Sequence, residues 1–140
     1  MDTGVCLKLN MFTTLVKQIS GKKLWSLKVP HKIKSMIWRA VTYSVPTLDL
    51  LVNRRVNVIN VCPMCQVEAE SILHVFVNCP IAKRCWDLIR SATVSTVVVD
   101  FSMWIARIFD MCSSKECAIL VTVVWNIWNS RNAIIWNNER

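Results

Sequence analysis

Four residues in the middle of the chain have the types and the spacing of a zinc site. Cys62 and Cys65 are separated by two residues, and His74 and Cys79 follow. A C-x2-C turn presents two sulfurs on one side of a tetrahedral ion, and a histidine and a cysteine about one helical turn apart can supply the other two ligands. Four protein ligands leave no position for water, so the pattern predicts one structural Zn²⁺.

Neighbouring residues bear on this prediction. Glu70, one turn before His74 in a helical register, is placed to accept the second imidazole proton. Cys85 is an alternative fourth ligand. The alternative to any metal is a set of buried free thiols, because free cysteine is among the most buried residue types. Residues 57–79 lack a long apolar periodicity, so a metal would supply order that packing does not.

The other residues able to do chemistry do not form a catalytic set. His31 is the second histidine, and among lysines it is expected to be a solvated side chain. The aspartates are scattered singly, without the paired spacing that two-metal chemistry requires. No nucleophile–base pair can be assembled from these residues. The sequence therefore predicts a protein that is not an enzyme and has no small-molecule substrate.

Positive charge is concentrated in the first third of the chain. The net charge is +8, and residues 1–39 hold eight Lys or Arg against one acid. This asymmetry favours contact with nucleic acid, an acidic protein or an anionic surface, and the alternative is a surface that only keeps an apolar protein soluble. RNA or DNA is the partner we expect, with phosphates on the cations and a base on a tryptophan. The candidate residues are Lys28, Lys32, Lys34, Trp38, Arg39, Arg54 and Arg55.

Cysteine usage and hydropathy bear on the compartment. Seven cysteines without a recognisable secretory signal indicate thiols in a reducing, intracellular compartment, either nucleus or cytoplasm. The most apolar stretch, residues 118–130, is shorter than the about 20 residues of a membrane span and holds two asparagines. We therefore expect a buried helix there, and no contact with a membrane.

Helices must position these residues, because two glycines and four prolines leave little turn chemistry for an all-β fold. The clearest helix follows Pro30, where apolar residues recur at helical spacing. These residues are Ile33, Met36, Ile37, Ala40 and Val41. Weaker patterns predict a helix at about 5–19 that stops at Gly21, a short one capped by Thr47, and others at about 100–111 and 116–136. A further helix begins at Pro80, with an apolar face of Ile81, Cys85, Leu88 and Ile89. Residues 24–29 and 93–99 are expected to be extended connections.

Several runs of residues occur together in one order. They are Leu24-Trp25-x-Leu27-Lys28-Val29-Pro30-x-Lys32-Ile33-Lys34-x-x-x-Trp38-Arg39, Pro46-Thr47-x-Asp49-x-Leu51-x-x-Arg54-Arg55, Cys62-Pro63-x-Cys65, Glu70-Ser71-x-x-His74-Val75-Phe76, Cys79-Pro80 and Trp86. The combination resembles the plant reverse-transcriptase zinc-binding domain, which lies downstream of the polymerase in non-LTR retrotransposon polyproteins. Near the end, Trp125-x-Ile127-Trp128-x-x-Arg131-Asn132 is similar to the segment that joins this domain to a ribonuclease H domain.

The resemblance implies three parts. Residues 1–23 would be an N-terminal helix and basic linker, residues 24–92 the zinc-binding domain, and residues 93–140 a helical segment that formerly led to ribonuclease H. The implied function is a nucleic-acid-binding accessory module derived from a retrotransposon. The alternatives are a scaffold that contacts other protein or a decayed fragment without activity. The scaffold alternative rests on the tryptophans of the C-terminal helix, Trp125, Trp128 and Trp136, and self-association is expected if the face that carries them is exposed.

Overall fold

The computed structural model describes residues 21–89 and 98–137, and this part of the chain contains helices and no β-strand. The expected mainly helical domain is thus confirmed. The helix expected at 5–19 and most of the extended connection expected at 93–99 lie outside the described residues. The labelled elements are α2 (His31–Val41), α3 (Leu48–Asn53), the π-helix η1 (His74–Asn78), α4 (Pro80–Ile89), α5 (Phe101–Met111) and α6 (Ser114–Asn137).

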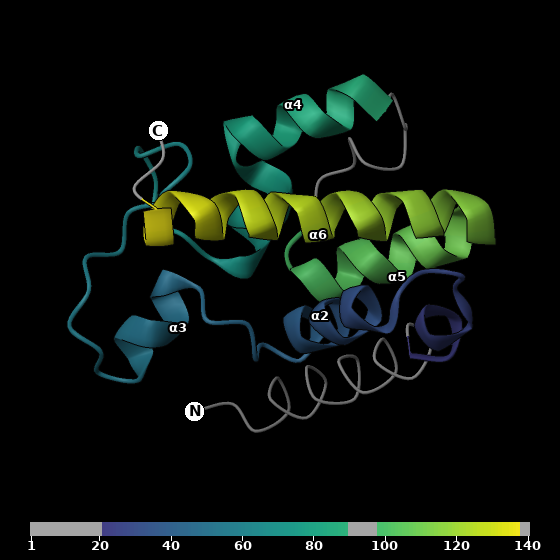
Figure 1. Ribbon diagram of the computed structural model, residues 1–140, viewed down its shortest axis with the longest axis horizontal. Coiled ribbons are helices and arrows are strands. Elements are labelled where there is room, and N and C mark those ends of the chain that lie inside the picture. Colours follow the sequence, from purple (N-terminus) through teal and green to yellow (C-terminus); the bar gives the residue numbers. More distant parts are fainter. Residues whose placement is uncertain (1–20, 90–97, 138–140) are drawn as a thin grey trace.

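The long helix α6 is the central element of the molecule. It runs along the long axis, with α4 on one side and α2 and α5 on the other (Figure 1). Helices α2, α5 and η1 all pack against it. Its buried residues include Cys117, Leu120, Val124, Ile127 and Arg131, a spacing that gives one inward stripe. No helix within the described ranges is both long and apolar enough to cross a bilayer.

Helix α2 has the inward face that its sequence predicts. It starts directly after Pro30, and the five apolar residues of the predicted stripe are all buried. Trp38 lies on the flank and is half-buried against the core. The stripe packs α2 against α6 and α5. Ser102 of α5 also donates a hydrogen bond of 3.0 Å to the Val41 carbonyl at the end of α2.

The segment before α2 differs from the prediction. Residues 21–26 are helical, so Gly21 does not end a helix and residues 24–26 are not extended. The reason is burial, because Leu24 and Leu27 lie three residues apart on one face and are 0% and 2% exposed. Gly21 itself lies against Trp38, where an added Cβ would be 3.4 Å from the ring.

Helix α4 also buries a face other than the expected one. Ala82 and Trp86 are buried, whereas Leu88 is 84% exposed. Trp86 turns inward because its indole N–H donates to the Phe76 carbonyl at 2.8 Å and its ring packs on Trp104. The expected apolar face instead lines an open groove shared with α6.

Candidate metal centre

The four predicted metal ligands come together at one point of the structure. One ligand atom from each of Cys62, Cys65, His74 and Cys79 lies within 4.8 Å of all the others. The Cys65 sulfur and His74 Nε2 are 3.4 Å apart. Cys62, His74 and Cys79 are buried, and Cys65 is half-buried. Within the described residues this is the one group of three or more His, Cys, Asp or Glu side chains arranged to hold a metal.

A tight turn positions the two sulfurs of the C-x2-C pair. The turn closes where Gln66 N–H donates to the Cys62 carbonyl at 2.9 Å, and Cys62 N–H donates to the Glu68 carbonyl at 2.8 Å. Gln66 lies in the left-handed region with φ of 60°, a conformation that side chains other than glycine adopt at a cost. The turn thus aims both thiols toward η1.

The π-helix η1 positions the other two ligands. His74 and Cys79 are five residues apart, and in an α-helix of 3.6 residues per turn they would point in different directions. Cys79 N–H donates to the His74 carbonyl at 2.6 Å, and this i→i+5 bond returns the chain to the same side. Ser71 starts this helical stretch by accepting the His74 N–H at 3.0 Å. The expected turn between the ligands exists, but it is a π turn.

The donor set and its dimensions fit zinc. Zn–S bonds of about 2.3 Å and Zn–N bonds of about 2.0 Å in a tetrahedron separate a sulfur from a nitrogen by roughly 3.5 Å. The 3.4 Å between Cys65 and His74 agrees with this separation. Three thiols and an imidazole are the soft and borderline ligands that structural zinc sites use, and the same set suits calcium or magnesium poorly.

Burial keeps Cys62 and Cys79 protonated at neutral pH in the metal-free fold. Burial raises the pKa of Cys62 to about 12, although backbone N–H groups of the turn, including that of Cys65, act against it. Burial also raises the pKa of Cys79, and the N–H groups of Ile81 and Ala82 at the start of α4 offset only part of this. Both groups must lose a proton before they bind a metal.

Cys65 has the opposite tendency. Burial acts to raise its pKa, but hydrogen bonds from the backbone N–H groups of Glu68 and Val67 and from the His74 side chain lower it to about 6. Cys65 is therefore mainly a thiolate at neutral pH. Because the thiolate is the form that binds metal, Cys65 is the ligand already prepared for a cation.

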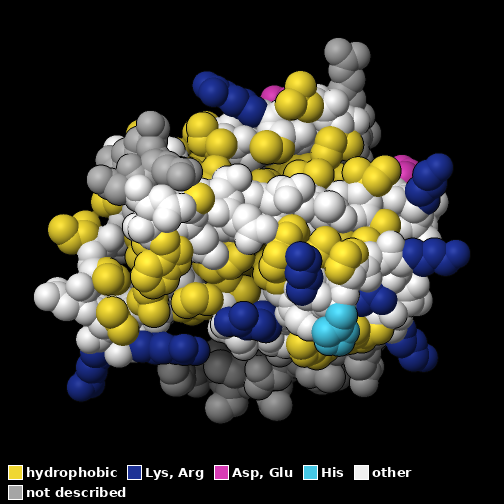
Figure 2. Space-filling model, in the orientation of Figure 1, with side chains coloured by type: hydrophobic (Ala, Val, Ile, Leu, Met, Phe, Trp, Pro, Cys, Tyr) yellow, Lys and Arg dark blue, Asp and Glu magenta, His cyan; other side chains and the backbone are white. Residues whose placement is uncertain are grey.

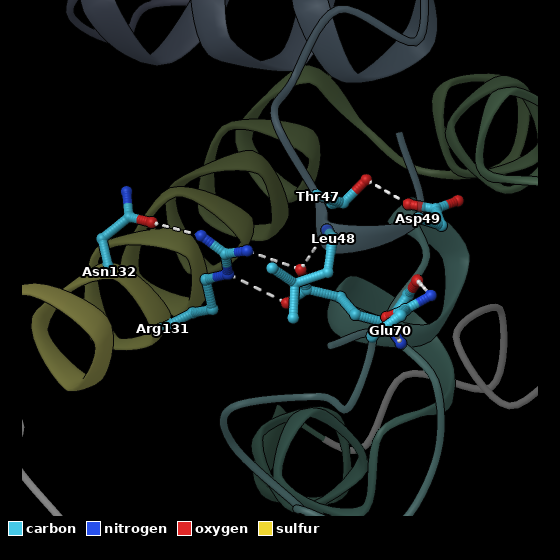
Figure 3. Close-up of polar contacts among 7 residues, drawn as sticks. Thr47, Leu48, Asp49, Glu70, Arg131 and Asn132 are labelled. Atoms are coloured by element: carbon cyan, nitrogen blue, oxygen red, sulfur yellow. Dashed lines mark hydrogen bonds and ion pairs between the residues drawn. The ribbon is translucent and has the colours of Figure 1, made fainter. Parts of the chain in front are cut away.

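The partner of the histidine is Glu68 and not the expected Glu70. Glu68 Oε2 lies 3.6 Å from His74 Nδ1, and the carboxylate is largely exposed. Glu70 is 1% exposed and forms a bidentate ion pair with Arg131 of α6, with a distance of 2.9 Å from Arg131 Nε to Oε2 (Figure 3). It also accepts the Leu48 N–H at 2.8 Å. The prediction failed because α6, distant in sequence, supplies a stronger partner.

Thr47 precedes α3 as expected but does not cap it with its side chain. Its hydroxyl donates to Asp49, and Glu70 satisfies the first helical amide in its place (Figure 3). The other thiols lie apart from the metal group. Cys85 is half-buried and lines the groove between α4 and α6, and Cys112 and Cys117 are buried in the core. Cys6 lies outside the described residues.

The predicted nucleic-acid residues are divided by the structure. Lys28, Lys32, Arg39, Arg54 and Arg55 are exposed. Arg54 and Arg55 follow α3, which lies toward the opposite end of the long axis from residues 21–28 (Figure 1). The structure therefore does not join all the arginines and lysines into one compact cluster.

Two of the predicted nucleic-acid contact residues, Lys34 and Trp38, have structural contacts within the protein. Lys34 is half-buried and donates to the Trp25 carbonyl at 3.0 Å. Trp38 is half-buried against the core, so its ring is a packing element. Sequence reasoning did not single out Trp25, whose 43% exposed ring lies beside His31. Tertiary packing decides which of the seven tryptophans are exposed, and the sequence alone does not show this.

The tryptophans of α6 are not equally available for self-association. Trp128 is 8% exposed, and Trp125 is partly buried beneath Lys32, whose Nζ lies 5.5 Å from the ring centroid. Trp136 is 81% exposed. Self-association through this helix stays a prediction that depends on Trp136.

A helical domain whose loop and π-helix present three thiols and an imidazole belongs to the class of zinc-binding domains. Comparison with known families gives the narrower assignment. The family described as zinc-binding in reverse transcriptase matches residues 8–86, more than half of the chain. The chain belongs to this family, and the resemblance to the zinc-binding domain of retrotransposon reverse transcriptases is confirmed.

A curated relative points in the same direction. The "putative ribonuclease H protein" of Arabidopsis thaliana is 33% identical over 63 residues, which is 45% of this chain and 10% of that protein. The match thus spans about a tenth of the length of this relative. No solved structure matches the chain. The boundaries expected at residues 23 and 92 stay predictions.

Proposed function

We propose that this domain is a non-catalytic accessory module that binds nucleic acid through a basic surface, and that one structural zinc ion stabilises it. The observation that carries the proposal is the charge of residues 21–48, which include six Lys or Arg and no Asp or Glu. Lys22, Lys28, Lys32 and Arg39 of this stretch are exposed. Basic side chains are also many and acidic ones few on the face shown in Figure 2.

The two remaining cations of this stretch support the structure. Lys23 Nζ donates to the carbonyls of Phe109 and Cys112 at 2.6 and 3.0 Å, so it satisfies the C-terminal end of α5. Lys34 donates a hydrogen bond to the Trp25 carbonyl. The four other cations stay exposed, although Lys32 lies over the Trp125 ring and Arg39 donates to the Ser44 carbonyl at 3.3 Å. Their exposed charges can meet phosphates, which is the interaction that supplies most of the affinity of non-specific nucleic-acid binding.

The proposed role of the metal is structural. Cys62, Cys65, His74 and Cys79 would hold the ion, and bound zinc would link the irregular chain of residues 54–71 to η1 and α4. Four protein ligands complete a tetrahedron and leave no open position for a reacting water. The chain's own part is to present one prepared thiolate and to bury the finished site.

The salt dependence of RNA binding tests the nucleic-acid part of this proposal. With three or four phosphate contacts, a plot of log affinity against log salt has a slope of roughly −2 to −3 for a single strand. A Lys28→Glu/Lys32→Glu variant should lose about tenfold or more in affinity, because two contacts become repulsive. Fluorescence anisotropy with a labelled uridine oligomer measures both effects.

The matched control makes the same charge change elsewhere. Lys83 and Arg84 are exposed on α4, which lies on the other side of α6 from α2 (Figure 1). A Lys83→Glu/Arg84→Glu variant should bind nearly as well as the unmodified protein. Affinity indifferent to salt, or an equal loss in both double variants, contradicts the proposal.

A further inference from the structure

An exposed pair of aromatic rings lies within the basic surface. The rings of Trp25 and His31 have centroids 5.3 Å apart and planes inclined by 31°. Trp25 is 43% exposed, whereas its neighbours Leu24 and Leu27 are 0% and 2% exposed. The leucines anchor this segment in the core, so the Trp25 ring is left available at the surface.

The backbone under this pair is braced on both sides. Lys34 of α2 donates to the Trp25 carbonyl at 3.0 Å, and Ser26 Oγ donates to the Lys23 carbonyl at 2.7 Å. Leu27 N–H donates to the Leu24 carbonyl at 3.2 Å. A fixed backbone removes part of the ordering cost of binding a ligand. The contact between the Trp25 and His31 rings further restricts both side chains.

Lysines lie close to the two aromatic residues in the sequence. Lys28 lies between the two aromatic residues in sequence, and Lys32 directly follows His31. Both lysines are exposed, and residues 21–48 hold no acid that would oppose an anion. Aromatic platforms interleaved with cations are how proteins bind single-stranded nucleic acid, with bases on the rings and phosphates on the cations.

We infer that Trp25 and His31 form a base-stacking site that makes this surface selective for single-stranded nucleic acid over duplex. The inference rests on the proposed function, since Lys28 and Lys32 supply the phosphate contacts. In a duplex the faces of the bases are covered by stacking, so only a single strand can place a base on Trp25. Stacking on an aromatic ring tolerates any base, so the site selects unpaired strands without reading their sequence.

The test compares four probes on the full chain loaded with zinc. The probes are labelled oligomers of uridine, of deoxythymidine and of abasic residues at equal length, and a duplex of the same length. The intact protein should bind both single strands more tightly than the duplex, and the abasic oligomer should bind about tenfold more weakly than its deoxythymidine counterpart. The comparison of RNA with DNA decides whether the sugar contributes.

Variants assign the effect to the rings. Trp25→Ala should lower single-strand affinity about tenfold while leaving the salt slope and the duplex affinity unchanged. Trp25→Phe should recover most of the loss, and Trp136→Ala, which removes another exposed tryptophan, should have no effect. The abasic probe needs no variant, so it tests the inference even if Trp25→Ala perturbs folding.

Two failures can be told apart. Salt-dependent binding that is equal for the abasic and deoxythymidine oligomers, or unchanged in a folded Trp25→Ala variant, overturns the stacking site and leaves the proposed function standing. Salt-dependent binding to none of the probes overturns both. Binding to anionic phospholipid vesicles without binding to any oligomer also overturns both, and would identify the basic surface as a lipid contact.

Discussion

At the scale of single residues, one cysteine of the metal centre differs from the other two in its protonation state. Cys65 has a pKa lowered to about 6, whereas the pKa of Cys62 is raised to about 12 and that of Cys79 is also raised. Near neutral pH the metal-free fold therefore holds one thiolate and two thiols. The two thiols must release their protons when a metal binds.

We expect zinc binding at about pH 7 to release about two protons per chain. Because protons are products of binding, affinity should rise with pH, by about two log units per pH unit until the thiols ionise. A metal-free chain that is unfolded, with three thiols at about pKa 8.5, would release nearly three protons. Calorimetric titration in buffers of different ionisation enthalpy counts them.

Substitutions at two ligands provide the matched comparison. A Cys62→Ser variant should release about one proton fewer, because the lost ligand was a thiol. A Cys65→Ser variant should bind zinc so weakly that it is purified without the metal, but when it is saturated with excess zinc it should release about the same number of protons as the unmodified protein. Equal changes in the two variants would contradict the assigned protonation states.

Residue types and spacing were enough to predict the four ligand candidates, because C-x2-C and the following His and Cys are set by local geometry. The partner of His74 was not predictable in the same way. Glu70 has suitable spacing, but the Arg131 guanidinium, 61 positions away in sequence, takes both of its oxygens. Such a contact depends on how α6 crosses the domain, which no local pattern encodes.

At the scale of elements, the buried Glu70–Arg131 pair ties three segments together. Glu70 precedes η1, Arg131 belongs to α6, and the Leu48 N–H that Glu70 accepts begins α3. The Arg131 guanidinium also lies over the Trp128 ring, 4.6 Å from its centroid. The pair thus connects the metal loop to the central helix.

A Glu70→Gln variant should lower the free energy of unfolding by about 3 kcal/mol, because it leaves the buried Arg131 charge without a counter-charge. Adding Arg131→Met should recover part of this loss, since the second change removes the uncompensated charge. Urea unfolding followed by tryptophan fluorescence measures both. As a control, Asp87→Asn on exposed α4 should change stability by less than about 0.5 kcal/mol. A Glu70→Gln variant as stable as this control would contradict the assigned role.

The sequence predicted some elements better than others. The stripe of α2 is regular enough to give its position and its buried face. Helix α4 was placed correctly, but its buried face was not, because the large Trp86 ring packs on Trp104 and its indole N–H finds a partner in the Phe76 carbonyl. The π turn of η1 was not predicted, since its extra residue follows from bringing His74 and Cys79 together.

At the scale of the whole molecule, one part of the chain is held by packing and another part depends on the metal. Around α6, α2 and α5 form a packed core with many fully buried side chains. The stretch between α3 and η1 has little helical structure and exposes apolar residues such as Ile59 and Val67, 85% and 81% exposed. On this account the core folds by packing, and the metal stabilises the loop, which its own packing holds only weakly.

The metal content of the purified protein tests the central claim most directly. Protein expressed without added metal should contain about one zinc per chain by elemental mass spectrometry. A Cys65→Ser variant should lose the metal and unfold with less cooperativity, whereas a Cys85→Ser variant should keep both, because Cys85 lies outside the four-ligand group. A folded protein without zinc, or a Cys65→Ser variant that retains a full zinc, would contradict the account.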